Sequence, residues 1–221
     1  DFATMWRRRF ELPIVAVTGS NGKTTVKEMV GTILRRHFAG PGEDAGVLVT
    51  WGNLNNHIGV PITLLWMRDS HRAAVIEMGA SARREIARLA AIAAPGIAII
   101  TNAGPAHLGG FGGTLRDVAE AKGELFAGLP AGSVAVINRD DPFYGYWRGL
   151  RDDITYRSFG LSAEADYRAV DVQALGVQGL RFRMLTPSGE IPVNLPMAGG
   201  HNVRNALAAA AASLAAGASL E

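Results

Sequence analysis

The chain has 221 residues, of which 48% are hydrophobic, and this composition supplies a sizeable core and excludes intrinsic disorder as the main state. Its 22 Lys and Arg residues barely outnumber its 20 Asp and Glu residues, and no long basic run concentrates the excess, so nucleic acid is not an expected partner. The lack of cysteine excludes disulfides, thiolate metal sites and thiol nucleophiles, and it is compatible with a cytoplasmic protein.

The first two thirds of the chain alternate apolar runs with amphipathic stretches, the pattern typical of βαβ units. Nearly continuous apolar runs predict parallel strands, covered on both faces, at residues 14–18, 47–51, 74–78, 97–101 and 134–138. The amphipathic stretches predict helices at residues 24–38, 61–66, 82–93, 115–129 and 142–148. Gly40-Pro41-Gly42 is predicted to be a loop.

After residue 151 the pattern becomes rich in short β-type runs separated by turns such as Pro187-Ser188-Gly189. These runs, at residues 154–159, 167–175, 180–186 and 190–195, predict antiparallel additions to the sheet, and an alanine-rich helix follows at 202–216. Without a low-complexity linker, the chain is interpreted as one α/β domain over residues 1–221, with a mostly parallel sheet flanked by helices and an antiparallel β addition in the C-terminal third.

Two segments superficially resemble a signal peptide or a membrane-spanning helix, and neither has the features of one. The basic residues Arg7, Arg8 and Arg9 precede an apolar run, but that run contains Glu11 and leads directly into a glycine loop, unlike a signal peptide. The alanine-rich segment at 206–218 is too short to cross a bilayer of about 30 Å. We therefore expect no membrane insertion.

The strongest motif is Gly19-Ser20-Asn21-Gly22-Lys23-Thr24-Thr25, which joins the first strand to a helix. Glycines allow backbone N–H groups to turn toward a phosphate, and the helix N-terminus adds its positive end. Lys23 would reach the terminal phosphates and Thr24 would bind Mg²⁺. Val17 occupies the first glycine position of the common P-loop pattern, so the spacing is a shifted one, and a plain strand-to-helix turn is the alternative.

Glu77 ends an apolar strand, at the edge where open α/β sheets bind ligands. A carboxylate there needs a cation, and Mg²⁺ bound through carboxylates and nucleotide phosphates is the natural candidate. The alternative is a partly solvated residue that pairs with Arg83 or Arg84.

His107 and Lys122 are further candidates. His107 follows the strand at 97–101 in a loop at the same sheet edge, where it could bind a metal or be an ordinary surface residue. Lys122 lies in the middle of the apolar face of the helix at 115–129, so either its stem reaches solvent or burial depresses its pKa and makes the neutral amine reactive.

Two polar segments complete the candidates: Asn138-Arg139-Asp140-Asp141 after a strand, and the segment 201–205 that opens the last helix. Asn202 and Asn205 share a helix face, and their amides could bind a base edge or a ribose. The alternatives are helix capping by Asn202 and an Asx turn at Asp140-Asp141.

Segments along residues 10–220 resemble the Mur ligases, in order. They are residues 18–25, Gly52-Asn53-Leu54-Asn55-Asn56, Glu77-Met78-Gly79-Ala80, Ala106-His107-Leu108, Ala121-Lys122-Gly123-Glu124, and His201-Asn202 with Asn205. The asparagine-rich segment and the surroundings of Lys122 are most similar to the Mur ligases that join D-alanyl-D-alanine to UDP-N-acetylmuramoyl-tripeptide. The resemblance implies the central ATP-binding domain alone, without the family's N-terminal UDP-binding and C-terminal Rossmann-like domains, so the isolated chain is expected to be inactive. Gly109 and His57 depart from the family pattern, which commonly has acidic residues there.

The resemblance also implies a reaction and roles for residues. The tripeptide carboxylate would attack the γ-phosphate of ATP, and the amine of D-alanyl-D-alanine would displace phosphate from the acyl phosphate. The implied groups are catalytic Lys23, Lys122 and His107, ATP-binding residues 19–25 with Asn202 and Asn205, substrate-binding Asn53 and Asn56, and Mg²⁺ held by Thr24, Glu77, His107 and a CO₂-derived carbamate on Lys122. Another Mur-type or folylpolyglutamate-type ligase, and an ATP-binding module without activity, are the alternatives.

Overall fold

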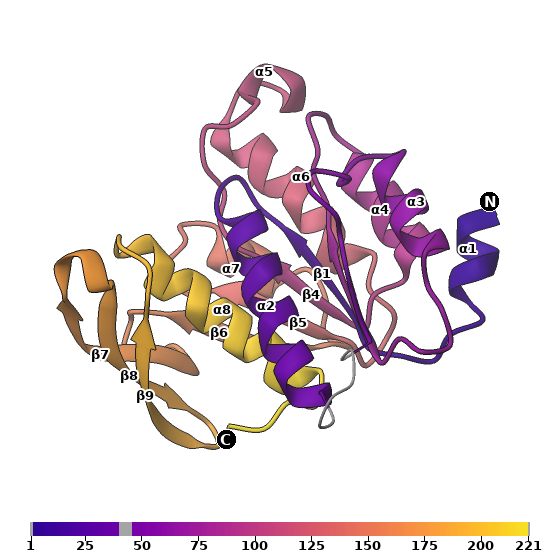
Figure 1. Ribbon diagram of the computed structural model, residues 1–221. Helices are drawn as coiled ribbons and strands as arrows, with labels where there is room; N and C mark the ends of the chain where they lie inside the picture. Colours follow the sequence, from indigo (N-terminus) through magenta and orange to yellow (C-terminus); the bar gives the residue numbers. More distant parts are fainter. Residues whose placement is uncertain (1, 40–45, 221) are drawn as a thin grey trace.

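The computed structural model describes residues 2–39 and 46–220. Within these residues one sheet of nine strands has the order β2-β3-β1-β4-β5-β6-β7-β8-β9 (Figure 1). Neighbouring strands from β2 to β7 pair in parallel, and β8 and β9 are antiparallel to their neighbours. The expected α/β class with a mostly parallel sheet is confirmed. The predicted Gly40-Pro41-Gly42 loop lies outside the described residues.

The predicted strands all occur. Their bounds are β1 (Ile14–Thr18), β2 (Val47–Val49), β3 (Ala73–Glu77), β4 (Ile97–Ile100), β5 (Val134–Asn138), β6 (Thr155–Gly160), β7 (Tyr167–Ala174), β8 (Leu180–Thr186) and β9 (Gly189–Leu195). The prediction that all four C-terminal strands are antiparallel additions was wrong for β6 and β7, which extend the parallel part of the sheet.

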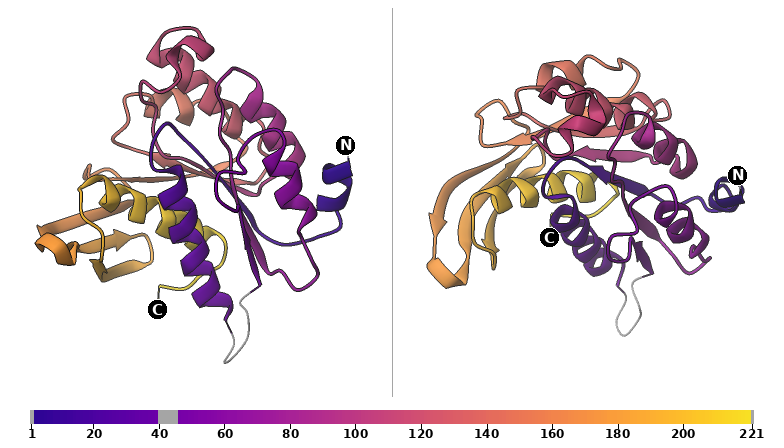
Figure 2. Two further views of the ribbon diagram at one scale, coloured as in Figure 1. Left: turned by 45° about the horizontal axis from the view of Figure 1, so that its top comes forward. Right: turned by 90° about the horizontal axis from the view of Figure 1, so that it is seen from above.

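Helices cover both faces of the sheet (Figures 1 and 2). On one face, α2 (Lys23–Phe38) packs against α8 (His201–Ala215), whose many alanines allow close approach. The other face carries α1 (Phe2–Arg7), α3 (Gly59–Leu65), α4 (Glu85–Ala93), α6 (Leu115–Ala127) and α7 (Tyr144–Arg148). A short turn, α5 (Leu108–Phe111), precedes α6. Two apolar clusters, one on each face, therefore hold the sheet between helices.

Helix boundaries follow local backbone chemistry. The α4 helix begins at Glu85 and not at 82, because Arg84 adopts a left-handed conformation (φ 68) and Glu85 accepts hydrogen bonds from the backbone of Ser81 and Ala82. A capping box between Thr114 and Asp117 fixes the start of α6. Three short elements were not predicted from the sequence: α1, α5 and a 3₁₀ turn at Gly176–Gln178.

None of the helices in the described part of the chain is both long and apolar enough to cross a membrane. The carboxyl ends of the central parallel strands β1, β3 and β4 meet at one edge of the sheet, and several of the predicted site residues, among them Lys23, His107 and Lys122, share a cavity there.

Candidate functional site

The glycine loop between β1 and α2 has a fixed conformation. Gly19 (φ 144) and Gly22 (φ 81) occupy backbone regions that side chains disfavour, and a Cβ on Gly22 would lie 2.6 Å from Asn205 Oδ1. The N–H groups of Ser20 and Asn21 donate to Asn102, and the Thr101 hydroxyl donates to Asn21 O. The loop is thus fastened to the segment after β4.

Lys23 is the first residue of α2, and its side chain folds back over the loop. Its Nζ donates to Gly19 O at 2.7 Å and to Ser20 O at 3.1 Å. Burial lowers the pKa of Lys23, and the Glu77 carboxylate partly opposes this shift. Because an α-helix leaves its first N–H groups without an intrahelical partner, this end of α2 presents donors and a cation together.

Glu77, at the end of β3, is 2% exposed and lies among polar groups that were not predicted as site residues from the sequence. Asn55 Nδ2 donates to Glu77 Oε1 at 2.8 Å, and Lys27 Nζ lies 4.0 Å from Glu77 Oε2. Lys27 is itself buried, and its Nζ also donates to Thr50 O at 3.0 Å. The alternative partners of Glu77, Arg83 and Arg84, contact acidic residues of α6 instead.

The oxygen chemistry around Glu77 fits a hard cation. Glu77 Oε2 is buried and has no hydrogen-bond partner among the described residues. Within residues 2–39 and 46–220, no three His, Asp or Glu side chains lie close enough together to hold a metal ion. A carboxylate that must be completed by water and phosphate oxygens is typical of Mg²⁺ sites and not of all-protein cages.

A cavity of about 340 Å³ opens between these segments. Its lining joins the glycine loop, the asparagine-rich segment, the turn after β3, the loop before α5 and the middle of α6: Gly19, Ser20, Lys23, Asn55, Asn56, His57, Gly79, Ala80, Ser81, Glu85, Ala106, His107 and Lys122. Residues that are up to 103 positions apart therefore share one cavity, at the sheet edge where the sequence placed a ligand.

Lys122 is only 3% exposed, so its side chain does not reach bulk solvent, although it lines the cavity. Its Nζ lies 5.1 Å from the centre of the Phe111 ring. Burial, and to a smaller extent the charge of Lys23, lowers the pKa of Lys122 to about 8, while Glu124 and Glu85 oppose the shift. The prediction of a buried lysine with a depressed pKa is thus confirmed.

The other predicted site residues do not all line this cavity. His107 is exposed at the cavity with a left-handed backbone (φ 57). Asn56 Oδ1 accepts from the N–H groups of Ile58 and Gly59, so it supports the start of α3. Asn53 is exposed and is not part of the cavity lining. Thr24 and Thr25 line a different, larger apolar cavity of about 1210 Å³ between α2, α8 and the β8–β9 hairpin.

The asparagines of α8 form a pair beside the glycine loop. Asn205 Nδ2 donates to Asn202 Oδ1 at 3.0 Å, and Asn202 Nδ2 donates to Ala198 O at 2.7 Å. The α8 helix starts after Gly200 without a side-chain cap, so the capping alternative for Asn202 was wrong. The pair is instead a buried amide contact that reaches Gly22.

The segment after β5 has a structural role. Asp141 Oδ1 accepts from Phe143 N in an Asx turn, which confirms that alternative, and its Oδ2 accepts from Ala103 N. Asp140 forms an ion pair with Arg204 of α8 at 2.9 Å and binds two N–H groups after β6. These contacts join the segments that follow three parallel strands.

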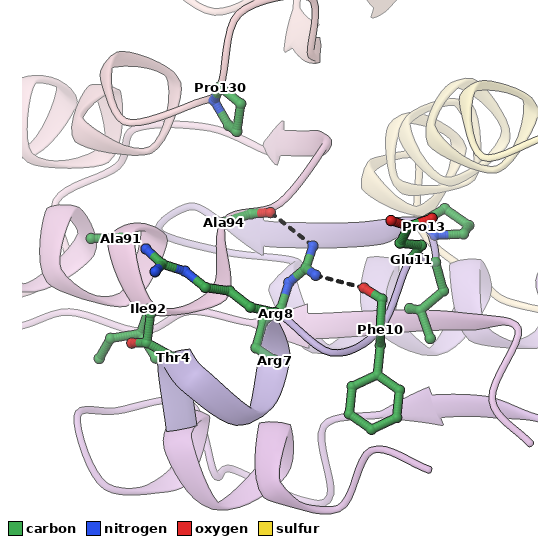
Figure 3. Close-up of a pocket in the computed structure, with 11 residues that line it drawn as sticks. Thr4, Arg7, Arg8, Phe10, Glu11, Pro13, Ala91, Ile92, Ala94 and Pro130 are labelled. Carbon is green, nitrogen blue, oxygen red and sulfur yellow. Dashed lines mark hydrogen bonds between the residues drawn. The ribbon is translucent and has the colours of Figure 1, made fainter. Parts of the chain in front are cut away.

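A cavity of about 520 Å³ lies among α1, the segment that precedes β1 and the end of α4 (Figure 3). Arg7 donates to the carbonyl oxygens of Ala93, Ala94 and Phe10, and so caps the C-terminal end of α4. Arg9 stacks on Trp6. None of the predicted site residues lines this cavity, and Arg7 and Arg9 of the basic cluster near the start of the chain make packing contacts.

A parallel sheet whose first strand leads through a glycine loop to a lysine at a helix start defines an α/β protein of the P-loop type. Residues 17–213 match the Mur ligase middle domain, and the chain belongs to this family.

A curated relative from Haemophilus influenzae, named UDP-N-acetylmuramoyl-tripeptide–D-alanyl-D-alanine ligase, is 43% identical over 220 residues, which are 100% of this chain and 46% of the relative. Crystal structure I of MurF from Acinetobacter baumannii has a TM-score of 0.91 at 40% identity and covers 99% of this chain and 46% of its own. MurF from Thermotoga maritima in complex with ADP has a TM-score of 0.85 at 27% identity, covering 99% and 49%. The chain spans about half the length of the curated relatives it matches.

Proposed function

We propose that the chain is the ATP-binding central domain of a ligase that joins D-alanyl-D-alanine to UDP-N-acetylmuramoyl-tripeptide, with residues 1–221 forming one domain. The observation that carries the proposal is the shared cavity, which unites Lys23 of the glycine loop with Asn55, the partner of Glu77, and with Lys122. Relatives that bear this ligase name, and a MurF structure with ADP, support it. The remainder of the substrate contacts would come from parts of the ligase beyond this domain.

In the proposed reaction, the peptide carboxylate attacks the γ-phosphate of ATP, so an O–P bond forms while the β,γ-bridging P–O bond breaks and ADP leaves. The amine of D-alanyl-D-alanine then attacks the acyl carbon; a C–N bond forms, the C–O bond to phosphate breaks, and the amine releases a proton. Lys23 and the first N–H groups of α2 would bind the phosphates and stabilise the negative charge in the transition state. The buried amides of Asn202 and Asn205 would face the adenine side of the nucleotide.

Mg²⁺ would be held by Glu77, with Thr24 and His107 as further contacts, and when bound it would neutralise phosphate charge. Glu77 Oε2, which is buried and accepts no hydrogen bond among the described residues, supports the first of these assignments. In the active ligase, we expect Glu77→Gln to raise the Mg²⁺ concentration for half-maximal activity by about tenfold, because one anionic ligand is lost. The matched change Glu190→Gln, on exposed β9, should leave this concentration unchanged.

For Lys122 we propose the carbamate that the resemblance implied. The neutral amine would attack CO₂, forming an N–C bond and releasing a proton, and the product anion would relieve the repulsion between Lys122 and Lys23. Its burial and its place at the cavity support this role. Under ¹³CO₂ we expect a ¹³C carbamate signal that disappears in Lys122→Ala, and partial rescue of that variant's activity by a short-chain carboxylic acid. A ¹³C spectrum without the signal would reject the carbamate.

Substrate dependence tests the proposed function as a whole. Because the chain spans about half the length of its relatives, the assay uses the longest natural form of the protein that contains it. We expect phosphate release from ATP only when UDP-N-acetylmuramoyl-tripeptide and D-alanyl-D-alanine are both present. Phosphate release with a folate and glutamate, or with a different amino acid, would favour the other ligases, and nucleotide binding without turnover would favour a binding module. The proposed substrate-binding role of Asn53 and Asn56 is tested by measuring the Michaelis constants for the peptide substrates in the Asn53→Ala and Asn56→Ala variants.

A further inference from the structure

The α5 turn has little internal support although it directly follows His107, which lines the cavity. It is only four residues long, and glycines occupy four of the five positions from 109 to 113. Short glycine-rich helices are marginal by themselves, because nucleation and backbone entropy both oppose them. Yet His107 at the start of this turn lines the cavity, and Phe111 at its end is 1% exposed with its ring near the Lys122 amine.

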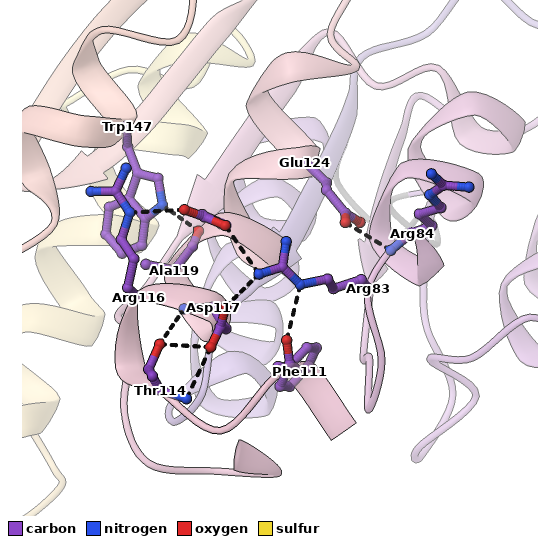
Figure 4. Close-up of polar contacts among 10 residues, drawn as sticks. Arg83, Arg84, Phe111, Thr114, Arg116, Asp117, Ala119, Glu124 and Trp147 are labelled. Carbon is purple, nitrogen blue, oxygen red and sulfur yellow. Dashed lines mark hydrogen bonds and ion pairs between the residues drawn. The ribbon is translucent and has the colours of Figure 1, made fainter. Parts of the chain in front are cut away.

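Arg83 supplies a contact that fastens this turn to the rest of the fold. Its Nε donates to Phe111 O at 2.9 Å, while its Nη2 binds the carboxylates of Asp117 and, at 3.1 Å, Glu120 (Figure 4). One planar guanidinium therefore joins three elements: the turn before α4, the α5 turn and α6. This use of several N–H groups in a fixed plane is specific to arginine.

The two turns also touch directly. A Cβ on Gly110 would lie 2.0 Å from Ser81 O, two residues before Arg83, so the backbones meet with no side chain between them. Behind this contact, Phe111 packs with Val118 and Ala121 of α6 in a small apolar cluster of its own. The α5 turn is thus held in place by one small apolar cluster and by Arg83, whose side chain is half exposed.

We propose that Arg83 is a positioning residue: by binding Phe111 O and the α6 carboxylates together, it keeps the α5 turn seated, with His107 at the cavity and the Phe111 ring over Lys122. Arg83 does not line the cavity itself. The importance of this positioning for catalysis rests on the proposed ligase function, whereas the positioning itself can be measured without any reaction.

Arg116 offers a matched control in the same cluster. Its Nε binds the same carboxylate, Glu120, at 2.9 Å, and its guanidinium stacks on the Tyr146 ring at 4.2 Å. It therefore shares the charge and one partner of Arg83, but it faces α7 and not the α5 turn. Changing either arginine to glutamine removes one positive charge from the cluster, so a difference between the variants reports the contacts that Arg83 makes and Arg116 does not, with Phe111 O and with Asp117.

The experiment compares Arg83→Gln, Arg83→Lys, Arg116→Gln and Arg116→Lys in the 221-residue chain. Hydrogen exchange, followed by mass spectrometry, reports residues 107–113, and the rate of acetylation at one pH reports access to the Lys122 amine. In both Arg83 variants we expect about tenfold faster exchange in this segment and several-fold faster acetylation of Lys122, because a charge-assisted contact is lost. Lysine should not rescue, since its one nitrogen cannot occupy both the Nε position that binds Phe111 O and the Nη2 position that binds the carboxylates.

The outcomes separate the positioning role from simpler ones. Unchanged exchange in the Arg83 variants would overturn the proposal, as would an equal increase in the Arg116 variants or full rescue by Arg83→Lys, since charge alone would then suffice. If Arg83→Gln does not fold, Phe111→Leu replaces it: it keeps an apolar side chain but removes the ring, so Lys122 should acetylate faster. In the active ligase, Arg83→Lys should lower kcat while the dissociation constant for ADP stays the same. Neither exchange nor acetylation needs ATP or peptide, so these results stand even if the proposed reaction is wrong.

Discussion

Replacing the buried Lys122 with methionine is expected to stabilise the fold at neutral pH. Burial lowers the pKa of Lys122 from 10.5 to about 8, which corresponds to about 3 kcal/mol of unfavourable folding free energy at pH 7. The cation–π contact with Phe111, at 5.1 Å, offsets about 1 kcal/mol of this cost. Methionine has a flexible apolar side chain that fits the same space, so Lys122→Met should gain about 2 kcal/mol at pH 7.

The protonation of Lys122 determines in which direction the stability difference between the two proteins changes with pH. Between pH 8 and 10.5 the unfolded chain holds the Lys122 proton while the folded chain releases it, so the stability of the unmodified protein rises across this window. The advantage of Lys122→Met should therefore be constant below about pH 8 and shrink as the pH approaches 10.5. Urea unfolding in buffers freed of CO₂, which keeps the amine unmodified, measures both variants at several pH values.

Lys27 provides the control, because it is a buried lysine with partners. Its Nζ donates to Thr50 O at 3.0 Å and lies 4.0 Å from Glu77 Oε2. Lys27→Met should therefore destabilise the fold at pH 7, by about 3 kcal/mol, since it leaves a buried carboxylate without its cation. A destabilised Lys122→Met protein, or a stability difference that does not change with pH, would refute the reasoning.

Three further predictions concern the glycine loop and the core. Gly22→Ala should lower the melting temperature by about 5 °C, because a left-handed alanine costs ~1–2 kcal/mol and its Cβ would meet Asn205 Oδ1. In an Asn205→Ala background this loss should be smaller, and additive losses would contradict the contact. Lys23→Met should weaken ADP binding, measured by calorimetry, by at least about tenfold with little change in melting temperature, and unchanged affinity would argue against a phosphate-binding role. Trp147→Phe should lower the unfolding free energy in urea by about 2 kcal/mol, because the indole donates to Ala119 O at 2.8 Å in the core, and a variant of unchanged stability would show that this bond contributes nothing.

The parallel strands could be predicted because their signal is local. Buried strands such as β1 and β5 are continuous apolar runs that end in polar loops, and both occur with the predicted bounds. The direction of a strand has no such local signal, because it depends on the path that the connecting loop takes between the two strands. The β6–β7 link spans only residues 161–166, which suggests a hairpin, yet the two strands are parallel. They pair only where β6 ends and β7 begins, Phe159 with Tyr167 and Gly160 with Arg168, so no long crossover is needed.

In the candidate site, too, residues with a local sequence signal could be predicted, whereas residues whose role depends on a distant partner could not. Lys23, Glu77 and Lys122 stood out because each has an unusual place in its own element: a lysine at a helix start, a carboxylate at the end of a strand, an amine on an apolar face. Asn55 and Lys27 did not, because their roles depend on Glu77, which lies 22 and 50 positions away. A signal for Lys27 existed in its place one turn after Lys23, beside the buried Val26.

The charges in and beside the cavity favour a ligand that carries both signs. Lys23 and Lys122 both line the cavity, burial lowers the pKa of each, and Lys23 makes protonation of Lys122 more costly still. An anion in the cavity would reverse that cost, since it stabilises both ammonium groups. Glu77 presents the opposite need, because its Oε2 is buried without a hydrogen bond and Lys27 lies at 4.0 Å. A nucleotide polyphosphate bound with Mg²⁺ would satisfy Lys23, and Lys122 while its amine is unmodified, with its oxygens, and it would satisfy Glu77 with its metal, whereas a simple anion would leave Glu77 more poorly solvated than before.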